Sequence, residues 1–213
     1  MARKIPPNKE QLVSCKNRKP IIIGIAGGSA CGKNRIVTAL SETLFRSILK
    51  IRILCMDAYF KKPLPKCIAP FSGREYDDYN HPESVDIKGL LADIKLFLES
   101  KEFDVIIIEG LLVLQDNDLR KLLDLKVFVD ADADERIVRR LRRNMRKRGL
   151  SFDEIADYYL DSVRFRHQEF VQLSKWYADI IMNGSQWSNT AIELLANWIK
   201  FRLKDRKRCD DVF

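Results

Sequence analysis

The 213-residue sequence contains no apolar run close to the roughly 18 residues that a membrane-spanning helix requires. Its first 20 residues are basic and contain prolines but no apolar stretch, which is not the pattern of a secretory signal. The five cysteines form no C-x-x-C pair and have no metal-ligand spacing, so free thiols in a reducing compartment are expected. These absences predict a cytoplasmic protein without a membrane span.

The sequence has fewer acidic residues than basic ones, which leaves a net charge of +8. The excess is local, because Arg136–Arg148 holds eight basic residues. Like charges four residues apart repel, so a helix here needs external anions, and a triphosphate is the obvious candidate. A solvated basic face is the alternative. The run has no nucleic-acid motif and no interleaved stacking aromatics, so neither nucleic acid nor membrane is an expected partner.

The most informative segment is a glycine loop that follows an apolar run, Ile21–Ala26, and ends in Gly32-Lys33. It matches the phosphate-binding pattern G-x-x-x-x-G-K-[ST], except that Asn34 stands where Ser or Thr is expected. Glycines let backbone amides approach an anion, and the following helix adds its positive N-terminus. The loop therefore predicts a nucleotide site, and Asn34 makes its metal ligation atypical.

Apolar runs alternate with segments of helical spacing along the chain. This pattern predicts a doubly wound, mostly parallel five-stranded α/β sheet between two helical layers, as in P-loop NTP hydrolases, with a helical lid. The expected strands are Ile21–Ala26, Ile51–Met56, Val105–Glu109, Val127–Asp130 and Ile180–Met182. The expected helices are Lys33–Leu49, Pro82–Glu99, Asp118–Leu123, Ala133–Lys147, Phe152–Ser174 and Ser188–Leu203. Ser151 and Glu154 form a capping-box signature before the fifth helix.

The division of the chain follows from these elements. Residues 1–20 are a basic extension, residues 21–203 the nucleotide-binding domain with a lid at about 136–165, and residues 204–213 a charged tail that we expect to be frayed. The long segment Lys61–Asn80 is expected to be a loop that is either functional or disordered.

Carboxylates end two of the predicted strands. Asp57 follows the second strand and Glu109 ends the third, so both reach the edge of the sheet where the glycine loop lies. One carboxylate could orient Mg²⁺ and the other could accept the proton of an acceptor hydroxyl. The alternative is that each carboxylate only caps a turn.

Together these motifs resemble the uridine kinase and phosphoribulokinase-like family of P-loop kinases. The resemblance spans Ile21 to about Ile199 and rests on Gly24–Lys33, Met56–Lys61, Asn80–Asp86, Ile108–Leu112, Phe128–Asp134, Arg139-Arg140, Arg148-Gly149 and Tyr177–Ile181. It implies ATP-dependent phosphorylation of a primary hydroxyl, typically the 5′-hydroxyl of uridine or cytidine, with ATP and Mg²⁺ as cofactors. A homo-oligomer is left open.

The resemblance also implies roles for individual residues. The predicted catalytic residues are Asp57 as the base, Lys33, Arg140 and Arg143. The predicted ATP-binding residues are Gly27, Gly28, Ser29, Ala30, Cys31, Gly32, Lys33, Asn34, Arg35, Arg148, Asn183 and Gly184. The predicted acceptor-binding residues are Asp57, Tyr59, Tyr79, Asn80, His81 and Arg140, and the predicted Mg²⁺ ligands are Asn34, Asp57 and Glu109. For His81, a structural role in the turn is an equal alternative. For the tyrosines, the equal alternative is packing in the core or in the loop.

The sequence departs from the family pattern at several acceptor-side positions. Asn80 replaces the aspartate that grips ribose, Leu150 replaces an arginine, and Tyr158 replaces a glutamine. A base-recognising hairpin that the family carries between Leu98 and Val105 is reduced to a short connection. The sequence therefore leaves three functions open: a uridine or cytidine kinase, a kinase for another acceptor such as pantothenate, nicotinamide riboside or a sugar phosphate, and a catalytically weakened nucleotide-binding pseudokinase.

Overall fold

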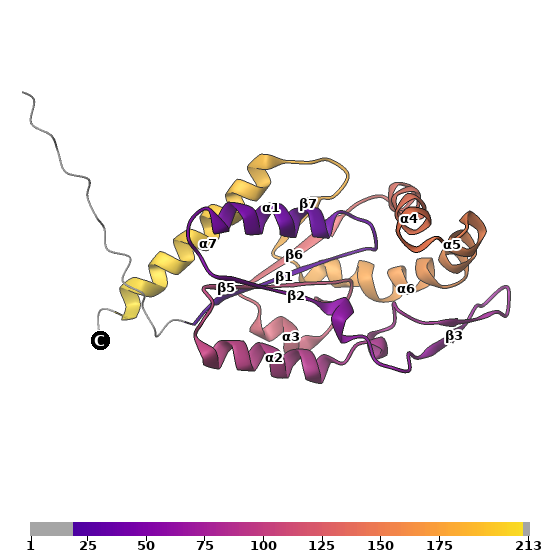
Figure 1. The fold of residues 1–213 in the computed structure, drawn as a ribbon, viewed down its shortest axis with the longest axis horizontal. Helices are drawn as coiled ribbons and strands as arrows, with labels where there is room; N and C mark the ends of the chain where they lie inside the picture. Colours follow the sequence, from indigo (N-terminus) through magenta and orange to yellow (C-terminus); the bar gives the residue numbers. More distant parts are fainter. Residues whose placement is uncertain (1–18, 211–213) are drawn as a thin grey trace, which may run out of the picture.

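The computed structural model describes residues 19–210, and of the predicted N-terminal extension it includes only Lys19 and Pro20 (Figure 1). Its centre is a five-stranded sheet in the order β2-β5-β1-β6-β7, in which every neighbouring pair is parallel. The strands are β1 (Ile21–Gly27), β2 (Ile51–Cys55), β5 (Val105–Glu109), β6 (Leu125–Asp130) and β7 (Ile180–Asn183). The predicted parallel five-stranded sheet is confirmed.

Helices cover both faces of the sheet, so the fold has three layers (Figure 1). On one face lie α1 (Lys33–Phe45) and α7 (Asn189–Asp210), and on the other lie α2 (Ile87–Ser100) and α3 (Asn117–Leu122). Alternate residues of β1 pack against the two helical layers: Ile23 lies in one apolar cluster and Ile22 in the other. A strand buried on both faces must be apolar throughout, which explains its unbroken apolar run.

The parallel strands bring functional groups to one edge of the sheet. Gly27, Glu109 and Asn183 are the last residues of β1, β5 and β7, and all three therefore lie at the carboxyl edge. Helices α4 (Ala133–Arg148) and α5 (Phe152–Tyr158) stand beyond the same edge (Figure 1). Ligands of open α/β sheets bind at this edge, which makes it the place to look for a site.

The predicted helix Phe152–Ser174 is almost continuous in the structure. It begins with the predicted capping box, in which the side chains of Ser151 and Glu154 each accept the other's backbone N–H. Beyond α5 it runs through η3 (Tyr159–Val163), α6 (Arg164–Arg166) and η4 (His167–Gln172), and a short 3₁₀ turn, η5 (Lys175–Tyr177), follows. The η3 and η4 segments are π-helical, a geometry that often occurs at functional sites.

Two features of the loop at 61–80 and the next helix differ from the sequence-based expectation. The loop contains an antiparallel hairpin of β3 (Lys66–Ile68) and β4 (Glu75–Asp77), held in part by the ion pair between Lys66 and Asp77 at 2.8 Å. The helix expected to start at Pro82 is divided into a 3₁₀ turn, η2 (Pro82–Ser84), and α2. The division occurs because Val85 is extended and Asp86 caps α2, accepting the Gly89 N–H at 3.0 Å.

Helix ends also differ from the expected ones. Helix α1 ends at Phe45 rather than Leu49, and Ile48 beyond it has a positive φ of 62° that no helix could continue through. Helix α7 extends to Asp210, so the first part of the predicted frayed tail is helical. It is anchored by the Arg206 guanidinium, which donates to the Pro20 carbonyl at 2.8 Å and to the Asp124 carboxylate at 2.5 Å. None of the helices within residues 19–210 is long and apolar enough to cross a membrane.

Candidate active site

The glycine loop joins β1 to α1 as its sequence predicts. Gly27 and Gly32 have positive φ angles of 145° and 106°, which a side chain would disfavour. The buried ammonium of Lys33 donates to the carbonyls of Gly27 at 2.8 Å and Gly28 at 3.0 Å, and lies 3.9 Å from the Cys31 thiol. The loop amides and the start of α1 thus have the form of an anion-binding site.

The glycine loop packs closely against neighbouring elements at two glycines, Gly184 and Gly28. A β-carbon on Gly184, in the turn after β7, would lie 2.1 Å from the carbonyl oxygen of Cys31. A β-carbon on Gly28 would lie 2.7 Å from the Arg136 guanidinium and 3.0 Å from the His167 ring. Glycine at both positions therefore lets the loop pack directly on the turn and on α4 and η4.

A cavity of about 920 Å³ opens between the glycine loop, the carboxyl edge of the sheet and helices α4 and α5. Asp57, in the 3₁₀ turn η1 (Met56–Tyr59), and Glu109 both line it. Asp57 follows β2 and Glu109 ends β5. These strands are neighbours, because Cys55 of β2 is the register partner of Glu109. Glu109 is buried, and the burial of Cys55, together with a hydrogen bond and the negative charge of Glu109, raises the pKa of that thiol to about 12.

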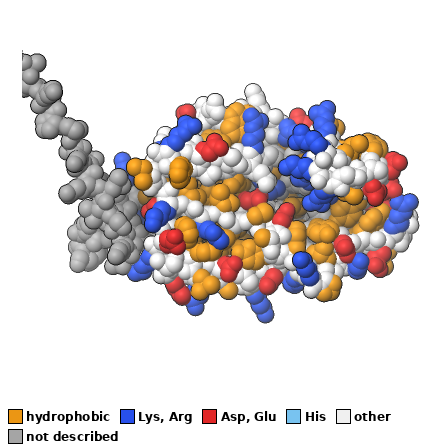
Figure 2. All heavy atoms as spheres, viewed as in Figure 1, with side chains coloured by type: hydrophobic (Ala, Val, Ile, Leu, Met, Phe, Trp, Pro, Cys, Tyr) orange, Lys and Arg blue, Asp and Glu red, His pale blue; other side chains and the backbone are white. Residues whose placement is uncertain are grey.

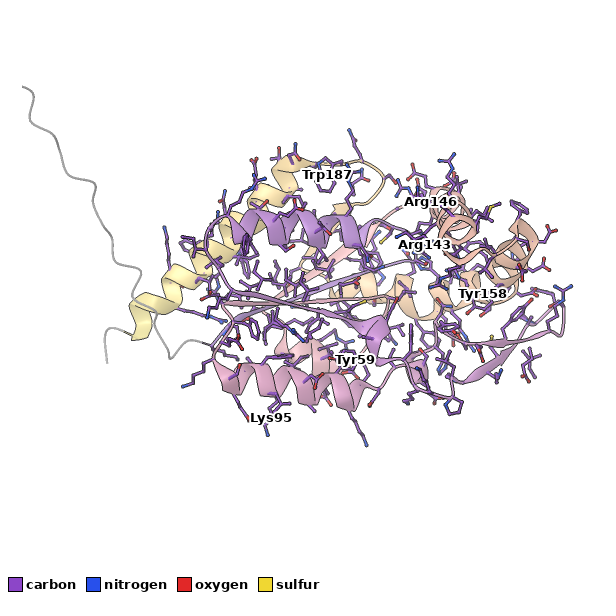
Figure 3. The ribbon with its side chains drawn as sticks, in the orientation of Figure 1. Tyr59, Lys95, Arg143, Arg146, Tyr158 and Trp187 are labelled. Atoms are coloured by element: carbon purple, nitrogen blue, oxygen red, sulfur yellow. The ribbon has the colours of Figure 1, made fainter. Side chains whose placement is uncertain are left out.

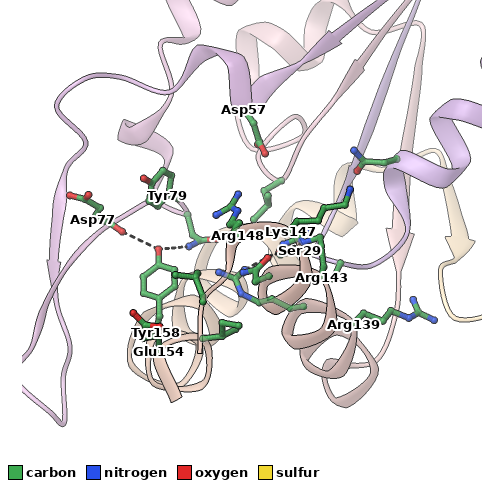
Figure 4. Close-up of a pocket in the computed structure, with 18 of the residues that line it drawn as sticks. Ser29, Asp57, Asp77, Tyr79, Arg139, Arg143, Lys147, Arg148, Glu154 and Tyr158 are labelled. Carbon is green, nitrogen blue, oxygen red and sulfur yellow. Dashed lines mark hydrogen bonds between the residues drawn. The ribbon is translucent and has the colours of Figure 1, made fainter. Parts of the chain in front are cut away.

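Arginines of α4 line the same cavity as these carboxylates, and Figure 4 shows Arg143 and Arg148 across it from Asp57. Arg140 and Arg143 donate to the Ser29 hydroxyl of the glycine loop at 3.0 and 3.3 Å. Burial, with repulsion from Arg143 and Arg148, lowers the pKa of Arg140 to about 10, and its Nε has no hydrogen-bond partner within the described residues. Positive charge is therefore concentrated beside the loop without carboxylate partners, an arrangement that favours a bound anion.

The other basic residues of α4 divide between structural and cavity positions. Arg148 and Lys147 line the cavity, and so does Arg139, which also donates to the Gly184 carbonyl at 2.9 Å and pairs with Glu135. Arg136 is buried and donates to the Ala131 carbonyl. In Figure 2 the blue Lys and Arg side chains of this region border a hollow in the surface. Only part of the basic run is thus a solvated face.

Asn80 and Tyr79 also line this cavity. Asn80 is buried, and its side-chain amide donates to the Tyr158 hydroxyl at 3.3 Å. The ring of Tyr79 meets that of Phe60 edge-on, with the centroids 5.3 Å apart. Figure 3 shows Tyr158 and Arg143 at the end of the molecule where α4 and α5 lie beyond the sheet edge.

Tyr59 and His81 do not line the cavity. The Tyr59 hydroxyl donates to Asp93 of α2 at 2.7 Å, and burial with this bond raises its pKa to about 12. His81 Nδ1 accepts the Glu83 N–H at 3.1 Å, and the ring packs edge-on against Phe170. Both side chains have structural partners, so their placement does not support the predicted contact with an acceptor.

A second cavity, of about 780 Å³, adjoins the other side of the glycine loop and is lined by Asn183, Gly184 and Arg35. The Arg35 guanidinium lies 4.2 Å from the centre of the Trp187 ring, which also lines this cavity. Asn183 Oδ1 accepts the backbone N–H of Ser185 at 2.8 Å and shapes the turn. The predicted ATP-binding residues are therefore brought together around the loop.

Sequence reasoning did not single out Trp187 or Phe60 as site residues, and noted Tyr158 only as a departure from a pattern. The signal for Trp187 was present, because it follows the Asn183-Gly184 turn at the end of the last strand. Phe60 stands three residues after Asp57 in the same motif.

Comparison with known proteins agrees with this geometry. Residues 72–191 match the model of the Phosphoribulokinase / Uridine kinase family. The chain is 37% identical to a uridine kinase of Bacillus licheniformis over 86% of its own length and 95% of that protein. It is also 37% identical to a uridine kinase of Geobacillus sp., over 89% of its length and 98% of that protein.

Solved structures show the same fold at lower identity. Phosphoribulokinase from Rhodobacter spheroides superposes with a TM-score of 0.58 and 14% identity, covering 79% of this chain and 73% of that one. Since the family model spans more than half of the chain and the curated relatives nearly all of it, the chain belongs to the Phosphoribulokinase / Uridine kinase family of P-loop kinases.

Proposed function

We propose that this protein transfers the γ-phosphoryl group of ATP to the primary hydroxyl of a nucleoside, uridine or cytidine, or of a similar small alcohol. The observation that carries the proposal is one cavity in which two carboxylates, Asp57 and Glu109, face Arg140 and Arg143 across the mouth of the glycine loop. Relatives named uridine kinase over nearly the whole chain support the nucleoside.

The roles follow from chemistry and position. Lys33 and the loop amides hold the β- and γ-phosphates. Asp57 is exposed in the cavity, and its carboxylate has no hydrogen-bond or ion-pair partner within residues 19–210, so it is available to accept the proton of the attacking hydroxyl. Arg140 and Arg143 neutralise charge on the transferring group, and their hydrogen bonds to Ser29 place them beside the loop.

Asn34, Asp57 and Glu109 would hold Mg²⁺. All three line the cavity and offer oxygen donors, the ligand type that this cation prefers. Within residues 19–210 no three His, Cys, Asp or Glu side chains gather as a metal site, which fits a cation held by few protein ligands and by substrate phosphates. Once bound, Mg²⁺ would neutralise the β,γ-phosphate oxygens. The Asn34 side chain is longer than the Ser or Thr of the pattern, so its amide oxygen cannot take the position of that hydroxyl, and weakened Mg²⁺ affinity is expected.

Residues 136–165 are proposed as a lid that closes over the phosphates and excludes water. They comprise most of α4 together with α5 and η3, and they supply Arg140, Arg143 and Arg148 to the cavity. Closing this segment would bring the arginines toward the reacting phosphate.

One observation favours a second candidate, a kinase for a different acceptor such as pantothenate, nicotinamide riboside or a sugar phosphate. Helix α2 ends at Ser100 and β5 begins at Val105, so the connection has no room for a base-recognising hairpin. The hairpin that the structure does contain, β3–β4, lies elsewhere in the sequence.

A panel of hydroxyl acceptors with γ-labelled ATP and Mg²⁺ separates these candidates. Labelled uridine or cytidine monophosphate is the expected product. Label on another acceptor would select the second candidate, and ATP binding without transfer to any acceptor would contradict the proposed activity and indicate a pseudokinase.

A further inference from the structure

The hairpin β3–β4 lies against the proposed lid (Figure 1). In the hairpin, the hydroxyls of Ser72 and Tyr76 both donate to the Asp161 carboxylate, at 2.6 and 2.8 Å. One turn earlier on the same helical run, the Asp157 carboxylate pairs with the Arg74 guanidinium. Residues four apart lie on one face of a helix, so both carboxylates of the lid are directed at the hairpin.

Further contacts join the hairpin to the lid on its other strand and at its turn. The Cys67 thiol in β3 donates to the Ser162 hydroxyl at 3.3 Å, and both residues are buried. The ring of Phe71, in the turn, lies 5.9 Å from the ring of Phe165. Ionic, polar and aromatic contacts thus attach the hairpin to the lid along its length.

The base of the hairpin and the end of the lid meet at one buried ion pair. The Asp78 N–H donates to the Pro65 carbonyl at 2.8 Å, which closes the base of the hairpin. The Asp78 carboxylate, with only 1% of the side chain exposed, accepts from the Arg166 guanidinium at 2.7 Å. Arg166 directly follows the last residue of the proposed lid, so hairpin and lid leave the body of the fold at the same place. A movement of one about this point would carry the other.

Hairpin and lid also form one continuous stretch of the active-site wall. Arg74, Tyr76 and Asp77 line the cavity from the hairpin, and Asp157 and Tyr158 line it from the lid. The Tyr158 hydroxyl donates to the Asp77 carbonyl at 3.0 Å across their boundary (Figure 4). The same lid carries the arginines of α4, so the position of the hairpin is linked to theirs.

We propose that Asp157 and Asp161 are positioning residues, which make the hairpin a part of the lid so that both close over the cavity as one body. They act through side chains of the hairpin rather than on the substrate. The inference rests on the proposed function and deepens it, because the unit that excludes water is then larger than residues 136–165 and includes residues 66–77.

Hydrogen exchange with and without a non-hydrolysable ATP analogue and Mg²⁺ tests the inference without turnover, because amide exchange reports local opening. In the unmodified protein the analogue should slow exchange in residues 66–77 as well as in residues 136–165. In Asp157→Ala/Asp161→Ala the lid should still respond, while the response of the hairpin should fall by at least about threefold.

Two further variants separate the proposed contacts from a general loss of charge. Glu169→Ala removes an exposed carboxylate of the same helical run that pairs with Arg166, and both segments should respond as in the unmodified protein. Asp157→Glu/Asp161→Glu keeps both negative charges and their acceptor oxygens, so the hairpin should again respond to the analogue. Urea unfolding establishes that each variant is folded.

Steady-state kinetics with uridine add a readout that a merely structural contact would not move. A hydrogen bond to a charged group is worth roughly tenfold or more in an equilibrium constant. We therefore expect kcat of the double alanine variant to fall about tenfold through impaired closure. Its Kd for ATP should stay within about threefold, because the contacts of the glycine loop are intact.

The outcomes distinguish this inference from the proposed function. An equal response of the hairpin in the double alanine variant and the unmodified protein, no response of the hairpin in the unmodified protein, or an unchanged kcat in the double alanine variant would overturn the inference. Loss of the hairpin's response in that variant alone, without transfer to uridine by any of the proteins, would contradict uridine phosphorylation and still support the inference.

Discussion

Replacing Gly184 by alanine should disable the nucleotide site by displacing the glycine loop. A β-carbon at this position would lie 2.1 Å from the carbonyl oxygen of Cys31 and 2.9 Å from that of Asp130. An ordinary carbon–oxygen contact is roughly 3.3 Å, so the glycine loop or the turn after β7 must move by about 1 Å. The obstructing atoms are backbone, which cannot turn aside as a side chain would.

The expected size of the effect follows from that displacement. Overpacking of a filled site costs about 1–3 kcal/mol of stability, and a 1 Å misplacement of positioning groups can cost about 100-fold in rate. We therefore expect Gly184→Ala to lower kcat/KM for ATP by about 100-fold while the protein stays folded at 25 °C. Steady-state kinetics and calorimetric ATP titration measure the first quantity, and urea unfolding measures the second.

Gly73→Ala is the matched control. Gly73 has a positive φ of 69°, and a β-carbon there meets nothing within 4 Å, so the substitution costs roughly 1 kcal/mol of backbone strain only. It should reduce stability and leave ATP affinity unchanged. Native ATP affinity in Gly184→Ala, or an equal loss in Gly73→Ala, would refute the idea that the turn after β7 positions the loop.

Three further predictions concern stability and metal use. Burial lowers the pKa of His167 from 6.5 to about 4, so between these pH values the unfolded chain binds a proton that the folded chain does not, and stability falls as the pH falls. The free energy of unfolding in urea should therefore differ between pH 7 and pH 4.5 by about 2–3 kcal/mol less in His167→Gln than in the unmodified protein. Equal pH dependence in both proteins would contradict this. Arg206→Ala should destabilise the fold by about 1–3 kcal/mol, because it leaves the partly buried carboxylate of Asp124 without its guanidinium; an unchanged urea midpoint would count against that anchor. Asn34→Thr should raise Mg²⁺ affinity or activity, and no change in either would argue against a metal role at this position.

Much of the fold was predictable because it depends on strong, local patterns. Strands β1 and β5 are buried on both faces, so their apolar runs identify them without ambiguity. The hairpin β3–β4 was not predicted, because each of its strands has three residues and carries no periodicity. The break between η2 and α2 depends on the Asp86 cap, which competes with a helical pattern that continues through it.

The candidate site was predictable in its phosphate-binding half and less so in its acceptor half. Lys33 and Asp57 were found because they belong to motifs at the ends of strands, and strand order brings those ends together. Tyr59 and His81 stand beside such motifs in sequence, but their side chains bond to Asp93 and to the η2 turn instead. The pairing of Asn80 with Tyr158 joins residues 78 positions apart, which no local pattern reveals.

The central claim is that Asp57 is the base of a phosphoryl-transfer site. The most direct measurement is ATP binding and label transfer from γ-labelled ATP in Asp57→Asn, an isosteric change at a residue that lines the cavity. General-base catalysis contributes roughly 10²- to 10⁴-fold, so transfer should fall by at least about 100-fold while ATP affinity stays within about threefold. Turnover equal to that of the unmodified protein would contradict the account.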